Sequence, residues 1–97
     1  MSVYVDELRQ YPSIKGKGWR YGKSCHLVAD TDAELHAFAE RIGMKQHWFQ
    51  HDSALPHYDL TAARRKLAVK LGAKEISKYV VVAMIRARRA AAEGRVL

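Results

Sequence analysis

The sequence predicts one small single-domain α/β protein, with a sheet of three to four short strands and about three helices. Ninety-seven residues suffice for one hydrophobic core. Two stretches alternate apolar and polar residues with the period of a strand, and three others have helical spacing or helix start and stop signals. The hydrophobic fraction of 48% is ordinary for a globular domain, which excludes a chain disordered throughout.

The N-terminal third predicts two strands joined by a long connection. Residues 2–6 alternate apolar and polar side chains, as a half-buried strand does. Residues 25–30 do the same, with Cys25 on one face and His26 on the other. Residues 9–24 hold one proline and three glycines, and connections of this length are usually functional or mobile.

The first helix is predicted between residues 31 and 43. Thr31 and Glu34 have the spacing of a capping box, in which side chains satisfy the free N–H groups of the first turn. Gly43 ends the helix, because glycine adopts the left-handed conformation without strain. The apolar positions that follow helical spacing are Leu35, Phe38, Ala39 and Ile42.

A weak internal repeat predicts that one αβ unit occurs twice on the same sheet. Residues 35–48 and 64–77 both read as helix, glycine, basic residue and short strand, with Gly43 and Gly72 aligned. The short strands expected from the repeat are residues 47–50 and 74–76.

Two further helices complete the predicted fold. One begins near Thr61, and Ser77 caps another that runs to about Glu93. The β-branched run at residues 79–82 also fits a strand, but the Ala- and Arg-rich stretch after it favours the helix. We expect residues 90–97 to form a frayed basic tail.

The charge is concentrated in the C-terminal third. Residues 1–61 carry a net charge of −1, and residues 62–97 carry +8. This asymmetry predicts an anionic partner such as nucleic acid, and the alternative is a solvated helix face that keeps the protein soluble. The candidate nucleic-acid-binding residues are Lys17, Arg20, Lys23, Arg64, Arg65, Arg86, Arg88 and Arg89.

The glycine-rich segment over residues 16–24 is not a nucleotide-binding loop. The spacing of its glycines does not match a P-loop, and a strand follows it instead of a helix. Its basic residues alternate with Trp19 and Tyr21, which is typical of a single-stranded nucleic-acid contact. The alternative is that Trp19 docks into the protein's own core.

Histidines and carboxylates form the second candidate site. Residues of these types bind divalent metals or act as acid and base, and ligand sites in α/β sheets gather at the carboxyl ends of strands. The alternative is that the aspartates cap helices and the histidines make structural hydrogen bonds. The candidate catalytic residues are His26, Asp30, His36, His57, Tyr58 and Asp59, and the candidate ligands of a divalent metal are Asp6, Asp30 and Asp59.

Two other constellations are weaker. His47 and His51 have metal-ligand spacing only if the segment is helical, and we expect it to be extended. Cys25 and His26 are adjacent on a strand, so their side chains point to opposite faces and make a poor nucleophile–base pair.

The sequence predicts a cytoplasmic protein. Cys25 is the single cysteine, so no internal disulfide forms, as is usual in a reducing compartment. The longest apolar run, residues 79–85, is far too short to cross a membrane, and charged residues occupy the place of a signal peptide.

Several segments together resemble the small bacterial and tailed-phage proteins grouped as domain-of-unknown-function family 4031. The resemblance spans nearly the whole chain. The segments that carry it are residues 3–6 (VYVD), 25–31 (CHLVADT), 34–39 (ELHAFA), 41–43 (RIG), 57–59 (HYD), 67–69 (LAV) and 71–73 (LGA).

No activity is assigned to that family, so the resemblance implies only which positions matter. By position these are Asp6, His26, Asp30, Thr31, His36, His57, Tyr58 and Asp59. His47 and His51 fall outside the pattern. Relatives have a shorter connection before the Cys-His pair, which implies that residues 13–24 are a basic, aromatic insertion particular to this chain.

Three functions follow from these observations. The first is an accessory protein that binds nucleic acid or another phosphate-containing ligand through a basic surface beside the His/Asp cluster. The second is a small hydrolase acting on phosphate, with or without a divalent metal, that uses His26, Asp30, His57 and Asp59. The third is a non-catalytic module that binds a host or phage protein.

Overall fold

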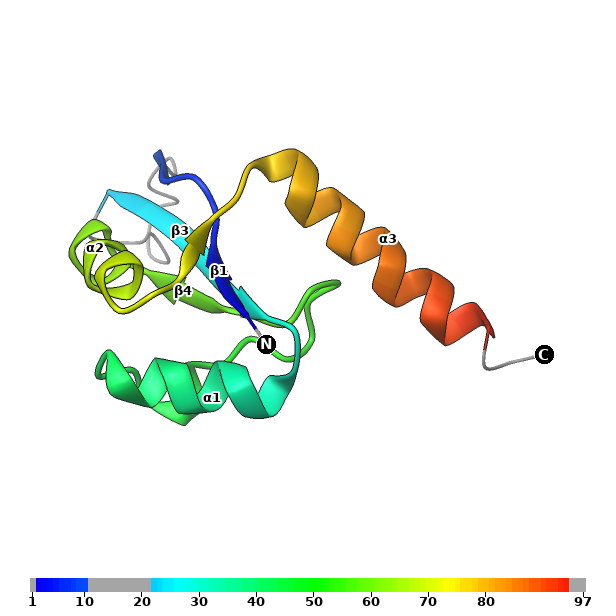
Figure 1. Ribbon diagram of the computed structural model, residues 1–97, viewed down its shortest axis with the longest axis horizontal. Helices are drawn as coiled ribbons and strands as arrows, with labels where there is room; N and C mark the ends of the chain where they lie inside the picture. Colours follow the sequence, from blue (N-terminus) through cyan, green and yellow to red (C-terminus); the bar gives the residue numbers. More distant parts are fainter. Residues whose placement is uncertain (1, 11–21, 95–97) are drawn as a thin grey trace, which may run out of the picture.

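The computed structural model describes residues 2–10 and 22–94, which form three helices and a mixed sheet (Figure 1). The α/β class is confirmed. The elements in chain order are β1 (Val3–Val5), β2 (Arg9–Gln10), β3 (Lys23–Ala29), α1 (Asp32–Arg41), the 3₁₀ helix η1 (Gln46–Trp48), β4 (Tyr58–Leu60), α2 (Ala62–Lys70), β5 (Lys74–Glu75) and α3 (Lys78–Gly94).

The central sheet has the order β4–β3–β1–β5. β1 and β4 are both antiparallel to β3, and β5 is parallel to β1. β2 pairs with the first residues of β3 in a register that differs by one residue from that of β1. The shift arises because residues 6–8 contain one residue more than the facing part of β3, as in a β-bulge. Such bulges often redirect a side chain near a functional site.

One face of the sheet forms the hydrophobic core. Side chains alternate between faces along a strand, so Leu27 and Tyr58 point toward α1 and α2, while His26 and Asp59 point away from them. Figure 1 shows α1 and α2 packed beside the sheet. The buried core consists of Val5, Cys25, Leu27, Leu35, Phe38, Ala39, Ile42, Met44, Tyr58, Leu60, Ala68 and Ala73.

The ends of α1 and α2 follow the predicted signals. The Thr31 hydroxyl accepts a hydrogen bond from the backbone N–H of Glu34, and Thr61 caps α2 in the same way. Gly43 and Gly72 both have positive φ, 80° and 109°, just after the helix ends. These conformations strain any other residue, so the glycines fix where each helix stops.

The strand predicted at residues 47–50 is wrong. Residues 46–48 form η1, and the backbone N–H of Gln50 donates to the carbonyl of His57 (2.8 Å), folding the chain back onto the segment before β4. Phe49 then packs its ring 5.5 Å from that of Tyr58. The first strand after α1 is therefore β4. The predicted repeat is confirmed for the two helix ends but not for the strand at residues 47–50.

The long connection predicted over residues 9–24 is shorter than expected. β2 occupies its first two residues, and β3 already begins at Lys23. Residues 11–21, which include most of the expected insertion, lie outside the described residues. The run at residues 79–82 belongs to α3, which confirms the predicted helix.

α3 packs loosely on the rest of the domain. No residue of this helix is fully buried, and Tyr79, Val80 and Val82 are exposed. Figure 1 shows it running away from the sheet toward the C-terminus. Among residues 2–10 and 22–94, no helix has the length and apolar character needed to cross a membrane.

Candidate metal centre

The centre is built on a contact between His26 and the buried Asp6. Asp6 follows β1 and lies opposite His26 of β3, where its backbone N–H donates to the His26 carbonyl (3.2 Å). The Asp6 carboxylate then accepts from the backbone N–H of His26 (2.6 Å) and lies 2.6 Å from the Nδ1 of its ring. In a regular antiparallel pair the backbone N–H of His26 would donate to a backbone carbonyl of the neighbouring strand. At the bulge that begins here, it donates to the Asp6 carboxylate instead.

Arg65 of α2 supports this arrangement from behind. Its Nε donates to the backbone carbonyl of Asp6 (2.9 Å), and its guanidinium also pairs with Glu75 of β5 (3.1 Å). The side chain is only 17% exposed. The structure thus gives Arg65, a candidate nucleic-acid contact in the sequence, a place inside the fold that ties α2 to β1 and β5.

His57 lies against His26. The two rings meet edge to face, with centroids 4.5 Å apart. The Nδ1 of His57 lies 2.8 Å from the backbone carbonyl of Leu55, and its Nε2 lies 3.3 Å from Oδ1 of Asp59. The same Asp59 oxygen lies 4.0 Å from Nε2 of His26.

Hydrogen bonding fixes which nitrogen of each ring carries the proton. A carbonyl oxygen can only accept, so His57 holds its hydrogen on Nδ1, and the ionised Asp6 carboxylate holds the hydrogen of His26 on Nδ1 in the same way. In the neutral rings both Nε2 lone pairs therefore face the carboxylate of Asp59.

These three donor atoms have the chemistry of a metal site. The nitrogens of His26 and His57 and a carboxylate oxygen of Asp59 all lie within 4.8 Å of one another. Metal-binding histidines usually donate their other N–H to a carboxylate or a carbonyl, as both rings do here. Two imidazoles and one carboxylate suit Zn²⁺ or a similar transition metal, whereas Mg²⁺ and Ca²⁺ prefer oxygen ligands alone.

The pKa shifts in the centre agree with this charge arrangement. Burial acts to raise the pKa of the Asp6 carboxyl, but its hydrogen bonds from His26 outweigh burial and hold the pKa below its ordinary value. Burial acts to lower the pKa of His57, but the hydrogen bonds that the protonated ring makes to Asp59 and Leu55 outweigh it and raise the pKa. The negative field at His57 therefore favours a positive charge at this position, whether a proton or a cation.

Solvent reaches the centre from one side. The side chains of His26 and Asp59 are 31% and 35% exposed, while those of Asp6 and His57 are mostly buried. A metal held by the three donors would therefore keep positions open to water or a ligand, as catalytic sites require.

Asp30 does not lie in this cluster. Because β1 and β3 are antiparallel, the carboxyl end of β3 meets the start of β1, and Asp30 accepts from the Ser2 backbone and the Tyr4 hydroxyl (both 2.9 Å). Asp30 is four positions along the chain from His26, which in an extended strand is roughly 13 Å. The expected ligand set of Asp6, Asp30 and Asp59 is thus not assembled, since Asp6 is also occupied by His26.

His36 and Tyr58 lie on the other face of the sheet. Tyr58 is buried in the core, and its hydroxyl lies 2.8 Å from the Nδ1 of His36 on α1. Adjacent residues of β4 point to opposite faces, so Tyr58 faces away from Asp59. The candidate catalytic residues are therefore divided among three places: Asp30 lies beside Ser2 and Tyr4, His36 pairs with Tyr58, and His26, His57 and Asp59 form the centre.

Cys25 and the pair His47 and His51, the two weaker candidate sites, take no part in the centre. Burial, the largest cause, raises the pKa of the Cys25 thiol to about 12, so Cys25 stays protonated and is a poor nucleophile. His47 and His51 are both exposed, and His51 pairs with Asp52 (2.9 Å).

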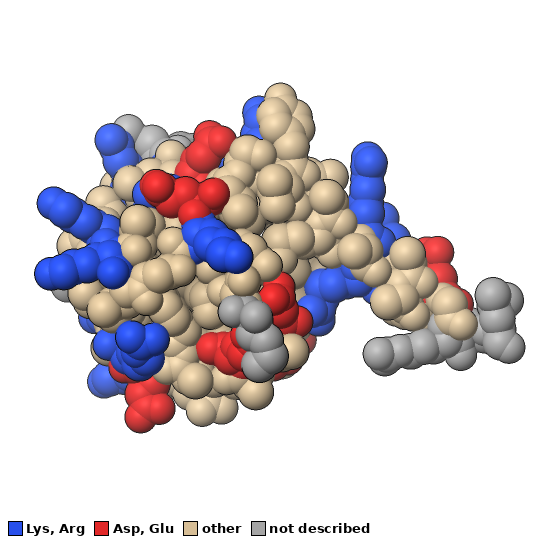
Figure 2. Space-filling model, in the orientation of Figure 1, with Lys and Arg blue, Asp and Glu red and all other residues tan. Residues whose placement is uncertain are grey.

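The basic residues do not gather around the centre. Lys17 and Arg20 lie outside the described residues, Lys23 begins β3, and Arg64 donates to the carbonyl of Ile42 at the end of α1. The exposed arginines of α3 are Arg86, Arg88 and Arg89. Figure 2 shows Lys and Arg spread over the viewed face, some along α3, some over the opposite end and some between these, beside acidic side chains.

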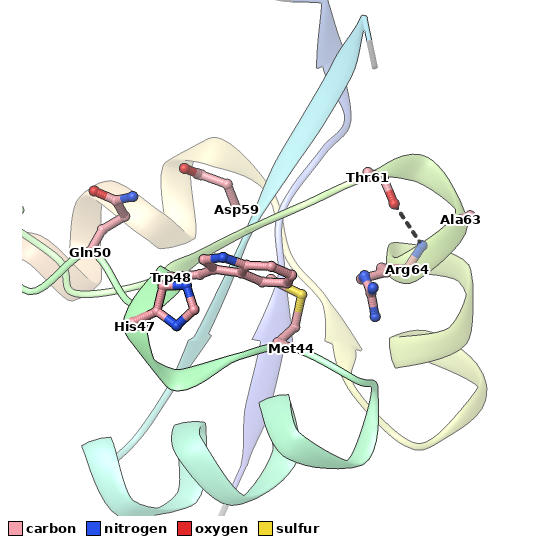
Figure 3. A pocket seen from close by; sticks show the side chains of 8 residues that line it. All are labelled: Met44, His47, Trp48, Gln50, Asp59, Thr61, Ala63 and Arg64. Atoms are coloured by element: carbon pink, nitrogen blue, oxygen red, sulfur yellow. Dashed lines mark hydrogen bonds between the residues drawn. The ribbon is translucent and has the colours of Figure 1, made fainter. Parts of the chain in front are cut away.

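A cavity of about 680 Å³ adjoins the centre and was not expected from the sequence. Its wall includes Asp59 together with Met44, Trp48, Gln50, Thr61 and Arg64 (Figure 3). The aromatic run at residues 47–49 is the sequence signal for this wall, but the sequence predicts a strand there. The support from the Leu55 carbonyl gives no sequence signal, because any residue supplies a backbone oxygen.

The fold and the centre together define a class: a small α/β domain in which two imidazoles and a carboxylate meet on one face of a mixed sheet. Within it, the chain belongs to the family described as Protein of unknown function (DUF4031), which it matches over residues 3–88. That range contains every residue of the centre, and the resemblance seen in the sequence is confirmed. No curated protein and no solved structure matches the chain.

Proposed function

We propose that the protein is a metal-dependent hydrolase of phosphate esters, with His26, His57 and Asp59 as the metal ligands. One observation carries the proposal. Two Nε2 lone pairs and a carboxylate oxygen face the same small space, while Asp6 and the Leu55 carbonyl hold the other nitrogen of each ring. Three protein ligands with open positions are typical of a catalytic metal site.

Each residue has a defined part in this proposal. Asp6 and the Leu55 carbonyl keep His26 and His57 in the tautomer that leaves Nε2 free to bind. A metal held by the three ligands would supply a water of lowered pKa and would polarise the phosphoryl oxygen. The net reaction adds one water across the ester P–O bond: its hydroxyl goes to phosphorus and its proton goes to the leaving oxygen.

The preference for phosphate rests on the charges near the centre. Arg64 lines the cavity that Asp59 shares, and residues 62–97 carry a net charge of +8. The net positive charge attracts anionic ligands to the protein, and Arg64 supplies a cation at the cavity beside the centre.

Hydrolysis of 4-nitrophenyl phosphate and bis(4-nitrophenyl) phosphate by Zn²⁺- and Mn²⁺-loaded protein tests the proposal. We expect turnover that a chelator abolishes and that His57→Ala and Asp59→Asn each reduce by at least about a hundred-fold, since both remove a metal ligand. Asp30→Asn is the matched control, because Asp30 also accepts two hydrogen bonds but lies outside the cluster. Activity that survives His57→Ala and Asp59→Asn would overturn the proposal.

Binding of nucleic acid along α3 is the second candidate function. Arg86, Arg88 and Arg89 are exposed on a helix that packs loosely on the domain. Phosphate contacts predict oligonucleotide binding that weakens steeply with salt and that triple substitution of these arginines by Ala lowers for every sequence alike. If no oligonucleotide binds, a host or phage protein is the remaining partner for this helix, through its exposed Tyr79 and Val82.

A further inference from the structure

The cavity beside the metal centre has one aromatic wall. Trp48 of η1 is 39% exposed. Its indole lies edge to face with His47, with centroids 5.8 Å apart, and the ammonium of Lys45 lies 5.8 Å from the ring centroid. These contacts and the cavity-lining Met44 hold a flat aromatic surface at the edge of open space.

Polar groups stand at both ends of this cavity. Figure 3 shows Gln50 and Asp59 toward one end and Thr61 and Arg64 toward the other, with Trp48 between them. Arg64 is held in place by its hydrogen bond to the Ile42 carbonyl, and its backbone N–H donates to Thr61 (3.2 Å). An apolar middle with few polar groups at its ends is typical of a site for a small planar ligand, and 680 Å³ lies within the usual range for such sites.

We propose that this cavity binds the nucleoside part of a nucleotide, with the base stacked on Trp48. The proposal rests on the proposed function for one feature, the position of the phosphate, which would bind at the Asp59 end where the cavity joins the metal centre. Stacking suits any base, because every base presents a flat π-face. Lys45 beside Trp48, and Arg64 at the end of the cavity away from Asp59, make the surroundings of the cavity more positive.

Stacking and metal binding depend on different residues, so they can be measured separately. In a Trp19→Phe background Trp48 is the sole tryptophan, and quenching of its fluorescence reports a ligand on the indole. The probes are adenosine, adenosine 5′-monophosphate and ribose 5-phosphate, each titrated into zinc-loaded and zinc-free protein. Calorimetry gives zinc affinity independently.

We expect the zinc-loaded protein to bind adenosine 5′-monophosphate at least about ten-fold more tightly than ribose 5-phosphate, since stacking on an aromatic ring supplies the difference. Trp48→Ala should remove that preference and leave zinc affinity unchanged, while Trp48→Phe should keep most of it. Tyr79→Ala is the matched control, because it removes an exposed aromatic ring far along the chain, on α3. The variants are compared by calorimetry.

Failure of the nucleoside site and failure of the proposed metal site give different results. If zinc binds and the two phosphates bind equally, or if Trp48→Ala keeps the preference, the nucleoside site is wrong and the metal centre stands. If zinc does not bind, the proposed function fails, and quenching of Trp48 by adenosine still decides the nucleoside site. Adenosine that neither quenches Trp48 nor binds by calorimetry then overturns it.

Discussion

The Nδ1 nitrogen of His26 lies 2.6 Å from one oxygen of the Asp6 carboxylate, and the backbone nitrogen of His26 lies 2.6 Å from the other. One carboxylate thus replaces a rung of the β1–β3 ladder and sets the orientation of the imidazole. Because Asp6 is buried and His26 is partly exposed, the contact is partly shielded from water and holds His26 more firmly than a fully exposed pair would. The position of the Nε2 atom that faces Asp59 follows from it.

Replacing Asp6 by Asn should weaken zinc binding by about 10- to 100-fold, the usual effect of losing a partner behind a metal-bound histidine. The amide still has an oxygen for the backbone N–H but cannot also accept from the ring with its nitrogen. Calorimetric zinc titration measures the effect. Asp30→Asn, which removes an equivalent carboxylate from the far end of β3, should leave zinc affinity within two-fold, roughly, because distant sites act independently. Equal losses in both variants would show a general effect on stability instead.

Zinc affinity should fall as the pH is lowered through the raised pKa of His57, starting above the ordinary histidine value of about 6.5. The metal needs the neutral ring, so protons compete for Nε2, and each pH unit below that pKa should cost up to about ten-fold in affinity. Calorimetry between pH 8 and 5.5 gives the profile. NMR titration of the metal-free His57 ring supplies the midpoint independently. An affinity that stays constant from pH 8 to 6 would contradict the assignment of His57 as a ligand.

The protein should lose stability in acid through Asp6. The pKa of this carboxyl is lower in the folded protein than in the unfolded chain, so the unfolded state binds the proton first as the pH falls. Its stabilising contribution is complete above the ordinary aspartate pKa of about 3.9 and is lost as the pH falls through the folded value. Urea unfolding of wild type and Asp6→Asn at pH 7 and pH 3 measures it. The difference in the free energy of unfolding between wild type and Asp6→Asn should be smaller at pH 3 than at pH 7. A difference that is larger at pH 3 would contradict the account.

Removing the Arg65 side chain should destabilise the fold by about 1–3 kcal/mol, because the buried Asp6 carbonyl loses its donor. Arg65→Ala also breaks the ion pair with Glu75. Lys66→Ala, an exposed neighbour on the same helix, should change the free energy of unfolding by less than about 0.5 kcal/mol. Urea unfolding measures the free energy of unfolding of both variants. An Arg65→Ala variant as stable as Lys66→Ala, with weakened oligonucleotide binding, would return Arg65 to the nucleic-acid-binding residues.

The local parts of the fold could be predicted from sequence, because their signals are local. The Thr31 cap and the stops at Gly43 and Gly72 need only neighbouring backbone groups, and all three are present. The segment at residues 47–50 could not be assigned correctly, because a strand of three or four residues is defined by its partner. Here β3 pairs with Tyr58–Leu60 instead.

The candidate site was predictable in its residue types but not in its grouping. His26, His57 and Asp59 converge because β3 and β4 are antiparallel neighbours with His26 opposite Asp59. The same antiparallel arrangement carries Asp30 away, although it shares the strand of His26. Strand direction depends on contacts between distant segments, which no window of sequence contains.

The metal centre itself is tested most directly by a crystal structure of the protein grown with Zn²⁺, with anomalous differences measured at the zinc edge. The account predicts a single strong peak about 2.0–2.2 Å from Nε2 of His26, Nε2 of His57 and a carboxylate oxygen of Asp59. In that structure the Nδ1 contacts to Asp6 and to the Leu55 carbonyl should be retained. Zinc found only on the exposed His47 or His51, with the three donors unligated, would contradict it.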